Sequence, residues 1–515
     1  MKQINITLNG KELSTSELLD LVNNPKTQVS ISTKALQKCS KANLFLKRIL
    51  DSRNDIIYGI NTGFGPMADY ILPKGKLEEL QKNLILSHAV GMGNPIDYKF
   101  ALSAMVVRLN TLAQGYSGVS LELLKKLEQF INLRIIPVIP EHGAVGTSGD
   151  LVQLAHIALA LLGKGKVFYQ GKVFYTKTLL KKLKINPYIL KPKEGLSLIN
   201  GTAMMSGVAS ILSEKAESIL ELAIQNSALA LELANGYEDS LAKELHSLRP
   251  HVGQNKVAEI LRQILSSSKL LNNRKLLANG HHNGNAIKKL PKKVQEVYSL
   301  RCVAQILGPI FETLELVKKQ VTTEINSVTD NPIIDAEKKT YYHGGNFHGD
   351  YISWSMDQLK TVLTKLTLLS ERRINFFLNP NINQNFPPFL NLQAIGLNLG
   401  LQGLQFVATS TASRSQTLSY PQYLHTIPTN GDNQDIVSMG TDSALIASQV
   451  VENTYIVLSI ELVALCQAVD FLKVENQLST KSKALYKKVR ENFPVVKEDK
   501  EIWENLEKLL ASLKV

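Results

Sequence analysis

Long segments with helical spacing constrain the fold of this chain more than any other feature. Their apolar residues recur every three or four positions, which places those residues on one face of a helix. Each segment is long enough for a helix of about 30 Å or more, since a helix rises about 1.5 Å per residue. The segments are residues 201–236, 294–326, 350–378, 390–412 and 436–472. Helices of this length bury their apolar faces against one another, so the sequence predicts a mainly α fold built on a bundle.

The first 200 residues have a mixed pattern. A short alternating strand is expected at Gln3 to Leu8, and helical spacing extends over 77–112 and again from Leu151 to a stop at Gly163. A hairpin is expected around Gln170-Gly171, and a second strand pair around Glu337-Lys338-Lys339. We therefore expect an α+β N-terminal part at 1–200, a bundle domain at 201–475 and a peripheral helical tail at 476–515.

Composition narrows the class of protein. Of 515 residues, 44% are hydrophobic and 20% charged, which is typical of a well-buried globular protein and not of a disordered one. The net charge of +13 could suit nucleic acid, but the lysines are dispersed and no nucleic-acid reading motif is present, so we expect a solvated basic surface. Three widely spaced cysteines, Cys39, Cys302 and Cys466, indicate reduced thiols. With no leader pattern and no run of 18 uncharged apolar residues, we expect a cytoplasmic protein that does not span a membrane.

Two glycine-rich segments stand out from the helices. The run DIIYGINTGFG at 55–65 favours a mobile, lid-like loop, because glycine lowers the cost of unusual backbone dihedrals. The run EHGAVGTSGDL at 141–151 places a serine between glycines, but Asp150 stands where the hydrolase motif G-x-S-x-G has its last glycine. One interpretation is a plain turn that caps the helix beginning near Leu151, with Ser148 or Asp150 as N-cap.

A second interpretation is chemical. In a strained turn, the amide nitrogen of Gly149 can attack the carbonyl carbon of Thr147, and loss of two waters, one of which carries the Ser148 hydroxyl, gives a ring with an exocyclic methylidene. Such a ring is a strong electrophile. Side chains supply nucleophiles and not electrophiles, so this group would act as a cofactor does.

This segment resembles the core motif of the aromatic amino-acid ammonia-lyases, the histidine, phenylalanine and tyrosine ammonia-lyases with their aminomutase relatives. The resemblance extends in order over further motifs and covers essentially residues 1–500. These are YGINTGFG at 58–65, NLILSHAVG at 83–91, LINGT at 198–202, YSLRC at 298–302, TDNP at 329–332, GGNFHGD at 344–350 and DNQDIVSMG at 432–440. It looks closest to the bacterial tyrosine ammonia-lyases, and it implies a histidase-like bundle of long helices with a small α+β N-terminal part that holds the active-site lid.

The resemblance implies a 4-methylidene-imidazol-5-one group formed from Thr147-Ser148-Gly149, with no external cofactor. Most of the family has alanine at the position of Thr147. Because that residue contributes only its carbonyl to the ring, threonine permits closure, but it is shared with some aminomutases and keeps that alternative open. Asp150 is expected to assist the dehydration.

The resemblance also assigns roles to the other motif residues. Tyr58 in the lid corresponds to the base that removes a benzylic hydrogen, and Arg301 to the arginine that binds the substrate carboxylate through its planar fork. Asn200 corresponds to an amide that donates to the ring oxygen of the prosthetic group. Further expected site residues are Tyr298 and Asn331, which orient the substrate, Phe347, which packs beside the electrophile, and Gln434, an active-site amide.

Selectivity depends on His88 and Gln434. Histidine near position 88 occurs in tyrosine-specific and in histidine-specific members, so His88 alone leaves both open. At position 434 the histidine-using members have glutamate, and the neutral Gln434 favours a phenyl or phenol ring. We expect elimination of ammonia from L-tyrosine to give trans-4-coumarate. The alternatives are a phenylalanine or histidine ammonia-lyase, an aromatic amino acid 2,3-aminomutase, and a non-catalytic relative that binds acidic partners.

The family resemblance implies a homotetramer in which three chains build each active site around a small aromatic amino acid. No nucleic-acid, membrane or metal partner is expected. The adjacent pair His281-His282 is not typical of a metal site, because neighbouring histidines do not easily aim at one ion and no carboxylate or cysteine is near.

Overall fold

The computed structural model describes residues 4–52, 55–278, 287, 290 and 293–514, so the His281-His282 pair lies outside the described residues. The chain divides into two compact units, each assembled from separate segments. The first comprises Met1–Glu214, Val317–Asp357 and Pro421–Ile446, and the second comprises Lys215–Leu316, Gln358–Tyr420 and Ala447–Val515. Each unit is discontinuous in sequence, whereas the parts expected at 1–200, 201–475 and 476–515 are continuous. The chain passes from one unit to the other within or just after a long helix. That three-part division stays a prediction.

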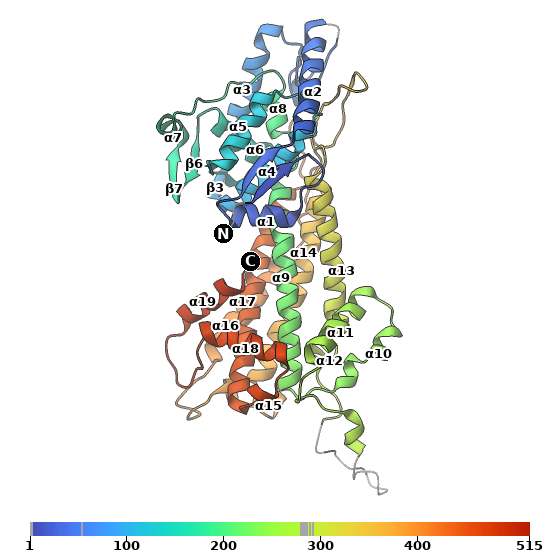
Figure 1. Ribbon diagram of the computed structural model, residues 1–515, viewed down its shortest axis with the longest axis vertical. Coiled ribbons are helices and arrows are strands. Elements are labelled where there is room, and N and C mark those ends of the chain that lie inside the picture. Colours follow the sequence, from blue (N-terminus) through green and yellow to red (C-terminus); the bar gives the residue numbers. More distant parts are fainter. Residues whose placement is uncertain (1–3, 53–54, 279–286, 288–289, 291–292, 515) are drawn as a thin grey trace. The chain divides into compact units, whose positions relative to one another are not determined.

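Among the described residues, the strands all lie in the first unit (Figure 1). Its elements are β1 (Asn5–Leu8), α1 (Thr15–Asn23), β2 (Gln28–Ile31), α2 (Thr33–Ser52), α3 (Leu77–His88), β3 (Met92–Pro95), α4 (Tyr98–Ala113), α5 (Leu121–Asn132), β4 (Ile136–Pro137), β5 (Pro140–His142), α6 (Leu151–Leu161), β6 (Lys166–Tyr169), β7 (Lys172–Tyr175), α7 (Thr176–Leu183), α8 (Glu194–Ile199), β8 (Ile333–Asp335) and β9 (Thr340–Tyr342).

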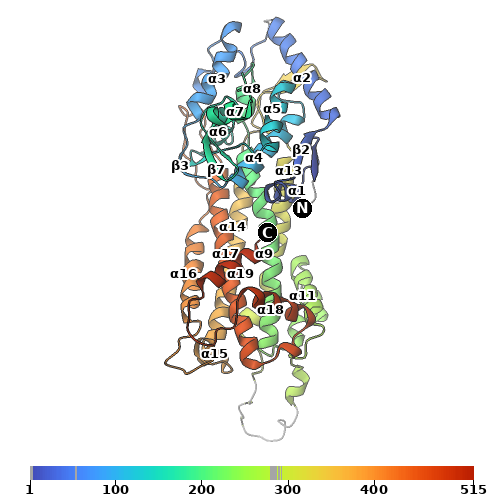
Figure 2. The same ribbon diagram turned by 60° about the vertical axis from the view of Figure 1, so that its left-hand side comes forward.

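Helix α4 forms the centre of the first unit. Its side chains are buried from Phe100 to Ala113, and α1, α2 and α5 contact it (Figure 2). The sheets are small. Strands β1 and β2 pair in parallel, and β6 and β7 form the expected hairpin, whose turn residues Gln170 and Gly171 have φ values of 49° and 77°. Two successive positive φ values are the requirement of a two-residue hairpin turn. The expected strand pair around residues 337–339 is also confirmed, as β8 and β9.

Four long helices have residues in both units: α9 (Ala203–Leu233), α13 (Val303–Ile325), α14 (Asp350–Leu378) and α17 (Gly440–Leu472). The second unit adds α10 (Lys243–Ser247), α11 (Val252–Leu265), α12 (Tyr298–Arg301), α15 (Pro380–Asn383), α16 (Gln402–Leu418), α18 (Thr480–Asn492) and α19 (Trp503–Leu513). Short 3-10 helices lie at Gly65–Met67, Lys74–Lys76, Glu238–Leu241, Arg274–Ala278, Pro388–Leu390 and Glu475–Gln477. The mainly α fold with long bundled helices is confirmed.

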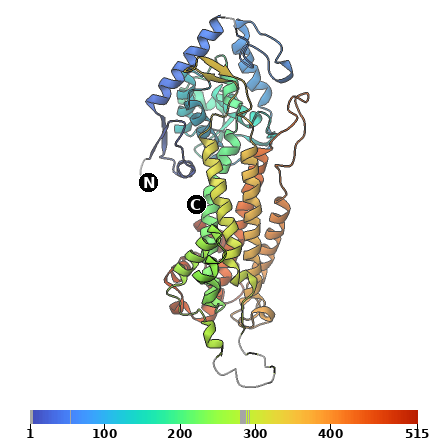
Figure 3. The same cartoon turned by 90° about the vertical axis from the view of Figure 1, so that its right-hand side faces the viewer.

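A buried ion pair joins three helices inside the second unit. Arg373 of α14 donates from Nε to Glu461 of α17 at 2.5 Å and from Nη1 to Ser227 of α9 at 2.6 Å. Both members of the pair are 1% exposed. Helix α16 runs beside α14, where Thr409 donates to Glu371 (Figure 3). These contacts fix the register of the helices in the bundle.

Two helical predictions were placed incorrectly. The stretch expected at 77–112 is interrupted by β3, where Gly91, Gly93 and Pro95 end helical structure and Gly93 takes a φ of 91°. The stretch expected at 390–412 is helical only from Gln402 to Leu418, because Gly396 and Gly400 have φ values of 95° and 59° and break the apolar pattern before it.

Helix α17 is long and apolar enough to cross a membrane by length and composition. However, 78% of its most apolar window is buried inside the protein, as in the core helix of a globular domain. The cytoplasmic location stays a prediction.

Candidate active site

A cavity of about 410 Å³ in the first unit gathers most of the residues expected at the site. Its walls come from the lid loop, the serine-glycine turn, α8 and its C-terminal end, and the loops that precede α14 and α17. The lining residues are Tyr58, Gly65, Ala68, Gly146, Thr147, Ser148, Leu196, Asn200, Asn331, Phe347, His348, Asn433, Gln434, Asp435 and Ile436. Segments more than 300 residues apart in sequence therefore meet around one cavity.

The serine-glycine turn is held in a backbone conformation that side chains normally avoid. Ser148 has a φ of 47° and Gly149 a φ of 82°. The Gly201 N–H donates to the Ser148 carbonyl at 3.0 Å, and the Asp150 N–H donates to the Gly201 carbonyl at 2.9 Å. A Cβ on Gly149 would collide with the backbone of Gly201, so only glycine fits there. The turn thus offers an unhindered glycine nitrogen in a constrained loop, which fits the requirement for ring closure between residues 147 and 149.

Asp150 stands at the N-cap position of α6, but its carboxylate does not cap that helix, so a side-chain cap on α6 is wrong for this residue. The carboxylate instead accepts the first N–H groups of α9, from Met204 at 2.8 Å and Met205 at 3.0 Å, and the hydroxyl of Thr441. The Asp150 side chain therefore caps α9 and not α6. Burial raises the pKa of Asp150 to about 6, against the opposing effect of these hydrogen bonds and of Arg108. Such a carboxyl can give and take a proton near neutral pH, as assistance to dehydration requires.

The lid loop is held by hydrogen bonds within itself and to Gln81 of α3, which also contacts α8. Gln81 of α3, which is fully buried, donates to the Gly59 carbonyl at 3.0 Å and accepts the Leu196 N–H at 2.9 Å. The Tyr58 phenol oxygen lines the cavity and accepts the Gly65 N–H at 3.1 Å. The lid loop therefore places Tyr58, the base expected from the sequence, in the cavity wall.

Two amides, those of Asn200 and Asn331, also line the cavity. Asn200, the C-cap of α8, donates from Nδ2 to the Asn331 carbonyl at 2.8 Å, and Asn331 accepts the Gly344 N–H on its Oδ1 at 2.8 Å. Asn200 Oδ1 is buried and has no partner among the described residues. In this orientation the group that Asn200 leaves available is an acceptor, and the donation to a ring oxygen expected from the sequence would need another orientation of the amide.

The two expected selectivity residues differ in placement. Gln434 lines the cavity, and its Oε1 accepts the Thr429 hydroxyl at 3.2 Å, which directs its NH₂ group away from Thr429. His88, at the end of α3, is not a lining residue. Its Nδ1 lies 2.9 Å from the Leu84 carbonyl and 3.0 Å from the Ser87 hydroxyl. With Nδ1 on the Leu84 carbonyl, Nε2 is the nitrogen left to meet another group.

Tyr298 and Arg301 belong to the second unit and do not line this cavity. Both lie on α12, where the Arg301 guanidinium stacks over the Tyr298 ring at 4.6 Å and Nε donates to the Glu296 carbonyl at 2.9 Å. Tyr298 is 69% exposed. The shared helical face expected from their spacing is confirmed.

Sequence reasoning missed His348, Asp330 and Lys193. His348 lines the cavity beside Phe347 and lies 3.1 Å from an Asp350 oxygen. Asp330 and Lys193 form a buried ion pair behind Asn200. His348 stands inside GGNFHGD, which was the available signal for it. Lys193 lies outside the motifs, and nothing in TDNP indicates that Asp330 is buried.

Comparison with protein families gives a match over residues 13–491 to the family described as aromatic amino acid lyase. Curated relatives cover nearly the whole chain. A probable histidine ammonia-lyase of Thermoplasma volcanium is 38% identical over 483 residues, 93% of each chain, and a histidine ammonia-lyase of Bacillus velezensis is 36% identical over 509 residues, 99% of this chain and 96% of that protein.

Solved structures agree in fold over the same length. The tyrosine aminomutase of Streptomyces globisporus and the phenylalanine aminomutase of Pantoea agglomerans each superpose with a TM-score of 0.95 and 34% identity. This chain is covered to 99% in both, and the two aminomutases to 97% and 99% respectively. With the family match, the cavity and the motif residues in agreement, the chain belongs to the aromatic amino acid lyase family and is an enzyme of its ammonia-lyase type.

Proposed function

We propose that this enzyme eliminates ammonia from an aromatic L-amino acid through an electrophile made from its own residues 147–149. The observation that carries the proposal is the turn at Ser148 and Gly149, held with positive φ values in the cavity wall and followed by the buried carboxyl of Asp150. The mature 4-methylidene-imidazol-5-one would supply an electron-poor carbon that activates the substrate for loss of ammonia.

The chain's own groups divide the remaining tasks. Tyr58 takes a proton from the substrate at its phenol oxygen after it has passed its own proton to solvent, and the Gly65 N–H donates a hydrogen bond to that oxygen. Asn200 and Asn331 orient polar groups of the bound amino acid. Phe347 packs against its ring, and the hydrogen bonds of the lid to Gln81 keep bulk water out of the cavity.

The relatives favour the alternatives over the tyrosine ammonia-lyase that we expect from the sequence. The two curated relatives are named as histidine ammonia-lyases and the two solved structures described above as aminomutases. We therefore propose histidine as the first substrate to test. Identities of 34 to 38% are too similar to separate these activities by themselves.

A neutral ring such as that of tyrosine is the second candidate, because of Gln434. Its NH₂ group is a hydrogen-bond donor, which favours an acceptor such as a phenol oxygen and gives no charge to balance an imidazolium. Thr147 favours an aminomutase outcome, because some aminomutases of the family share this threonine. In that outcome, ammonia that is retained behind a closed lid adds back to the β-carbon.

We further propose that the working enzyme is a homotetramer in which other chains supply Tyr298 and Arg301 to this cavity. The described lining contains no arginine or lysine to bind a substrate carboxylate. Analytical ultracentrifugation measures the oligomeric state at the concentration used for the activity assay. A protein that is monomeric and fully active at that concentration would contradict this proposal.

The test is to incubate the purified enzyme separately with histidine, tyrosine and phenylalanine and to follow the ultraviolet absorbance of each unsaturated acid. Chromatography of the same reactions separates unsaturated acids from β-amino acids. Intact mass provides an independent measurement, because formation of the prosthetic group removes two waters, about 36 Da. An unmodified mass together with no turnover on any of the three would overturn the proposed function.

A further inference from the structure

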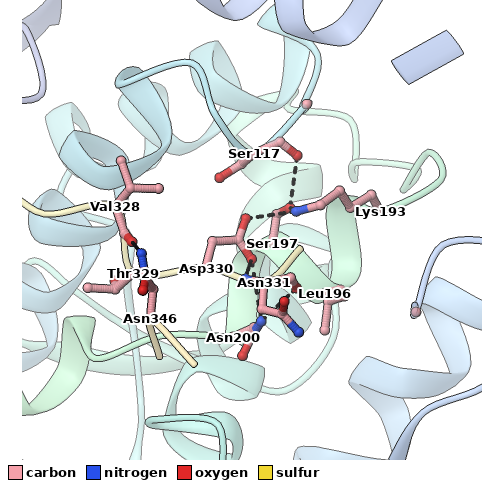
Figure 4. A network of polar contacts seen from close by, with 12 residues as sticks. Ser117, Lys193, Leu196, Ser197, Asn200, Val328, Thr329, Asp330, Asn331 and Asn346 are labelled. Carbon is pink, nitrogen blue, oxygen red and sulfur yellow. Dashed lines mark hydrogen bonds and ion pairs between the residues drawn. The ribbon is translucent and has the colours of Figure 1, made fainter. Parts of the chain in front are cut away.

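A second cavity, of about 580 Å³, adjoins the active-site cavity in the first unit. Its walls come from the C-terminal end of α13, the residues that follow that helix, and the residues that lead into α14. Figure 4 shows part of this wall, where Asn346 donates to the Val328 carbonyl at 3.5 Å. His348 lines both cavities, and its Nε2 lies 3.1 Å from Asp350 Oδ1, an atom of a residue that lines the second cavity. The two cavities therefore meet at the His348 side chain.

The second cavity extends from the protein interior to the surface. At its inner end Thr329 is 3% exposed, and its hydroxyl lies against Gly201, where an added Cβ would be 2.8 Å from Thr329 Oγ1. At its outer end the Asp350 side chain is 42% exposed and Tyr351 is 68% exposed. Because the Gly201 N–H donates to the Ser148 carbonyl, the inner end lies close to the turn that carries the proposed electrophile.

The lining of the second cavity is acidic and contains an unpaired hydroxyl. Glu324 and Asp350 contribute carboxylates, and the described lining contains no lysine or arginine. Thr329 Oγ1 is buried and has no hydrogen-bond partner among the described residues. A buried hydroxyl without a partner is costly, and a ligand that donates to its oxygen would remove that cost. The lining therefore suits a small cation that carries N–H donors.

Glu324 differs from the neighbouring buried carboxylate, that of Asp330. Asp330 has Lys193 as its partner, whereas Glu324 has no ion pair among the described residues. Glu324 Oε1 accepts the Thr202 hydroxyl at 2.5 Å, and burial raises the pKa of Glu324 against the opposing effect of this hydrogen bond. A cation in the second cavity would stabilise the ionised form of Glu324, as Lys193 does for Asp330.

The proposed reaction produces a cation of this kind. Elimination converts the amino acid zwitterion into an unsaturated carboxylate and an ammonium ion, and in the overall balance the proton lost from the β-carbon becomes the fourth hydrogen of the ammonium ion. The two products have opposite charges, so carboxylates in a cavity wall attract the ammonium ion and repel the unsaturated acid. We propose that the second cavity is an ammonium-binding site through which this product leaves the active site past His348. The inference rests on the proposed function and adds to it a binding site for one product.

The test removes the two charges and keeps the shape of the cavity. The cavity variant is Glu324→Gln with Asp350→Asn, in which the glutamine keeps an acceptor oxygen for Thr202. The control is Glu12→Gln with Glu337→Gln, which removes two charges from exposed positions of the same unit. Both are made first in Ser148→Ala, where no electrophile can form and ammonia cannot add to one. Melting temperatures are measured in increasing ammonium chloride, with sodium chloride keeping the ionic strength constant.

We expect ammonium to raise the melting temperature of Ser148→Ala and of the control, because a ligand that binds the folded state stabilises it. The apparent dissociation constant should rise at least about tenfold in the cavity variant, since each lost carboxylate weakens the attraction. Equal dissociation constants in the cavity variant and the control would overturn the proposal, and so would the absence of an ammonium effect on Ser148→Ala. If the cavity variant does not fold, Asp350→Asn alone, at a partly exposed position, gives the same comparison.

Chains that keep Ser148 test the route. Ammonium chloride should inhibit their turnover, because an occupied cavity holds back the next ammonium ion. The inhibition constant should rise about tenfold in the cavity variant, while KM for the amino acid stays within about twofold of its wild-type value. Equal inhibition of the wild type and the cavity variant would overturn the proposed route. A wild type without turnover on histidine, tyrosine or phenylalanine would instead contradict the proposed function, and the melting temperatures would still decide whether the cavity binds ammonium.

Discussion

Each compact unit completely buries an ion pair, but the two pairs have different surroundings. In the second unit, Arg373 and Glu461 join three regular helices, and their remaining hydrogen bonds go to other buried side chains of the bundle. In the first unit, Lys193 and Asp330 lie behind a cavity, and the carboxylate directs groups that line it. The same chemical feature therefore has different neighbours, which are bundle side chains in one unit and cavity-lining asparagines in the other. Substitutions of the bundle pair Arg373–Glu461 should change stability, and those around the cavity should change chemistry.

The largest expected effect is that of Ser148→Ala. Alanine has no hydroxyl to lose, so no methylidene can form, and turnover should fall by at least about 10³-fold while the melting temperature changes little. Absorbance assays and intact mass measure the two consequences. Ser210→Ala, which removes a buried hydroxyl bonded to the Ser206 carbonyl, is the control and should keep its turnover. Full activity of Ser148→Ala would show that the turn at the cavity does not supply the electrophile, and the proposed chemical role of the cavity would then be wrong.

Arg373→Met tests the second unit. Glu461 would remain buried without its cation, and the free energy of unfolding should fall by about 3–5 kcal/mol. Urea denaturation measures this loss. The adjacent Arg372 is 61% exposed and pairs with Glu371, so Arg372→Met should cost less than about 1 kcal/mol. A large loss of turnover per folded molecule in Arg373→Met would contradict a purely structural role.

Asp150→Asn should change the pH dependence of stability. Because the pKa of Asp150 is raised to about 6 in the folded protein, from an ordinary 3.8, the folded state binds this proton more tightly than the unfolded chain does. The stability that this proton contributes is complete below about pH 4 and is lost as pH rises through 6, a loss of about 3 kcal/mol that the variant should not show. Unfolding midpoints between pH 4 and 7 measure the difference. Asp69→Asn, at an exposed lid position, should leave the profile unchanged.

Tyr58→Phe should reduce kcat by about 10²-fold, the usual scale of a lost general base, and should leave the mass change intact. Tyr70→Phe alters an exposed tyrosine five residues beyond the lid loop and should have little effect. A change confined to KM would reduce Tyr58 to a packing residue.

The smallest expected effect is that of Gln434→Glu. A carboxylate in the cavity would attract an imidazolium, and the ratio of kcat/KM for histidine over that for tyrosine should rise about tenfold. Asn433→Asp introduces the same charge at the neighbouring lining position. If both variants shift selectivity equally, the effect is one of net charge and Gln434 is not the selector.

The sequence predicts regular elements well where one pattern dominates. The expected helix at 350–378 coincides with α14, and the hairpin at Gln170-Gly171 is observed, because apolar spacing and turn chemistry agree there. The motifs also predict much of the cavity wall, from Tyr58 to Gln434. Lys193 and Asp330 could not be recognised in this way, since charged residues normally indicate solvent and their burial depends on each other.

The segments that meet at Asp150 also set the order in which synthesis, folding and ring closure can occur. Its carboxylate is held by backbone groups at 204–205 and by Thr441, while the turn before it is held by Gly201. A nascent chain that has emerged only as far as α9 lacks the contact with Thr441. If residues 147–149 mature as we propose, ring closure must therefore wait until the ribosome has released residue 441. The reactive carbon would then arise only after the walls that shield it from stray thiols and amines have formed.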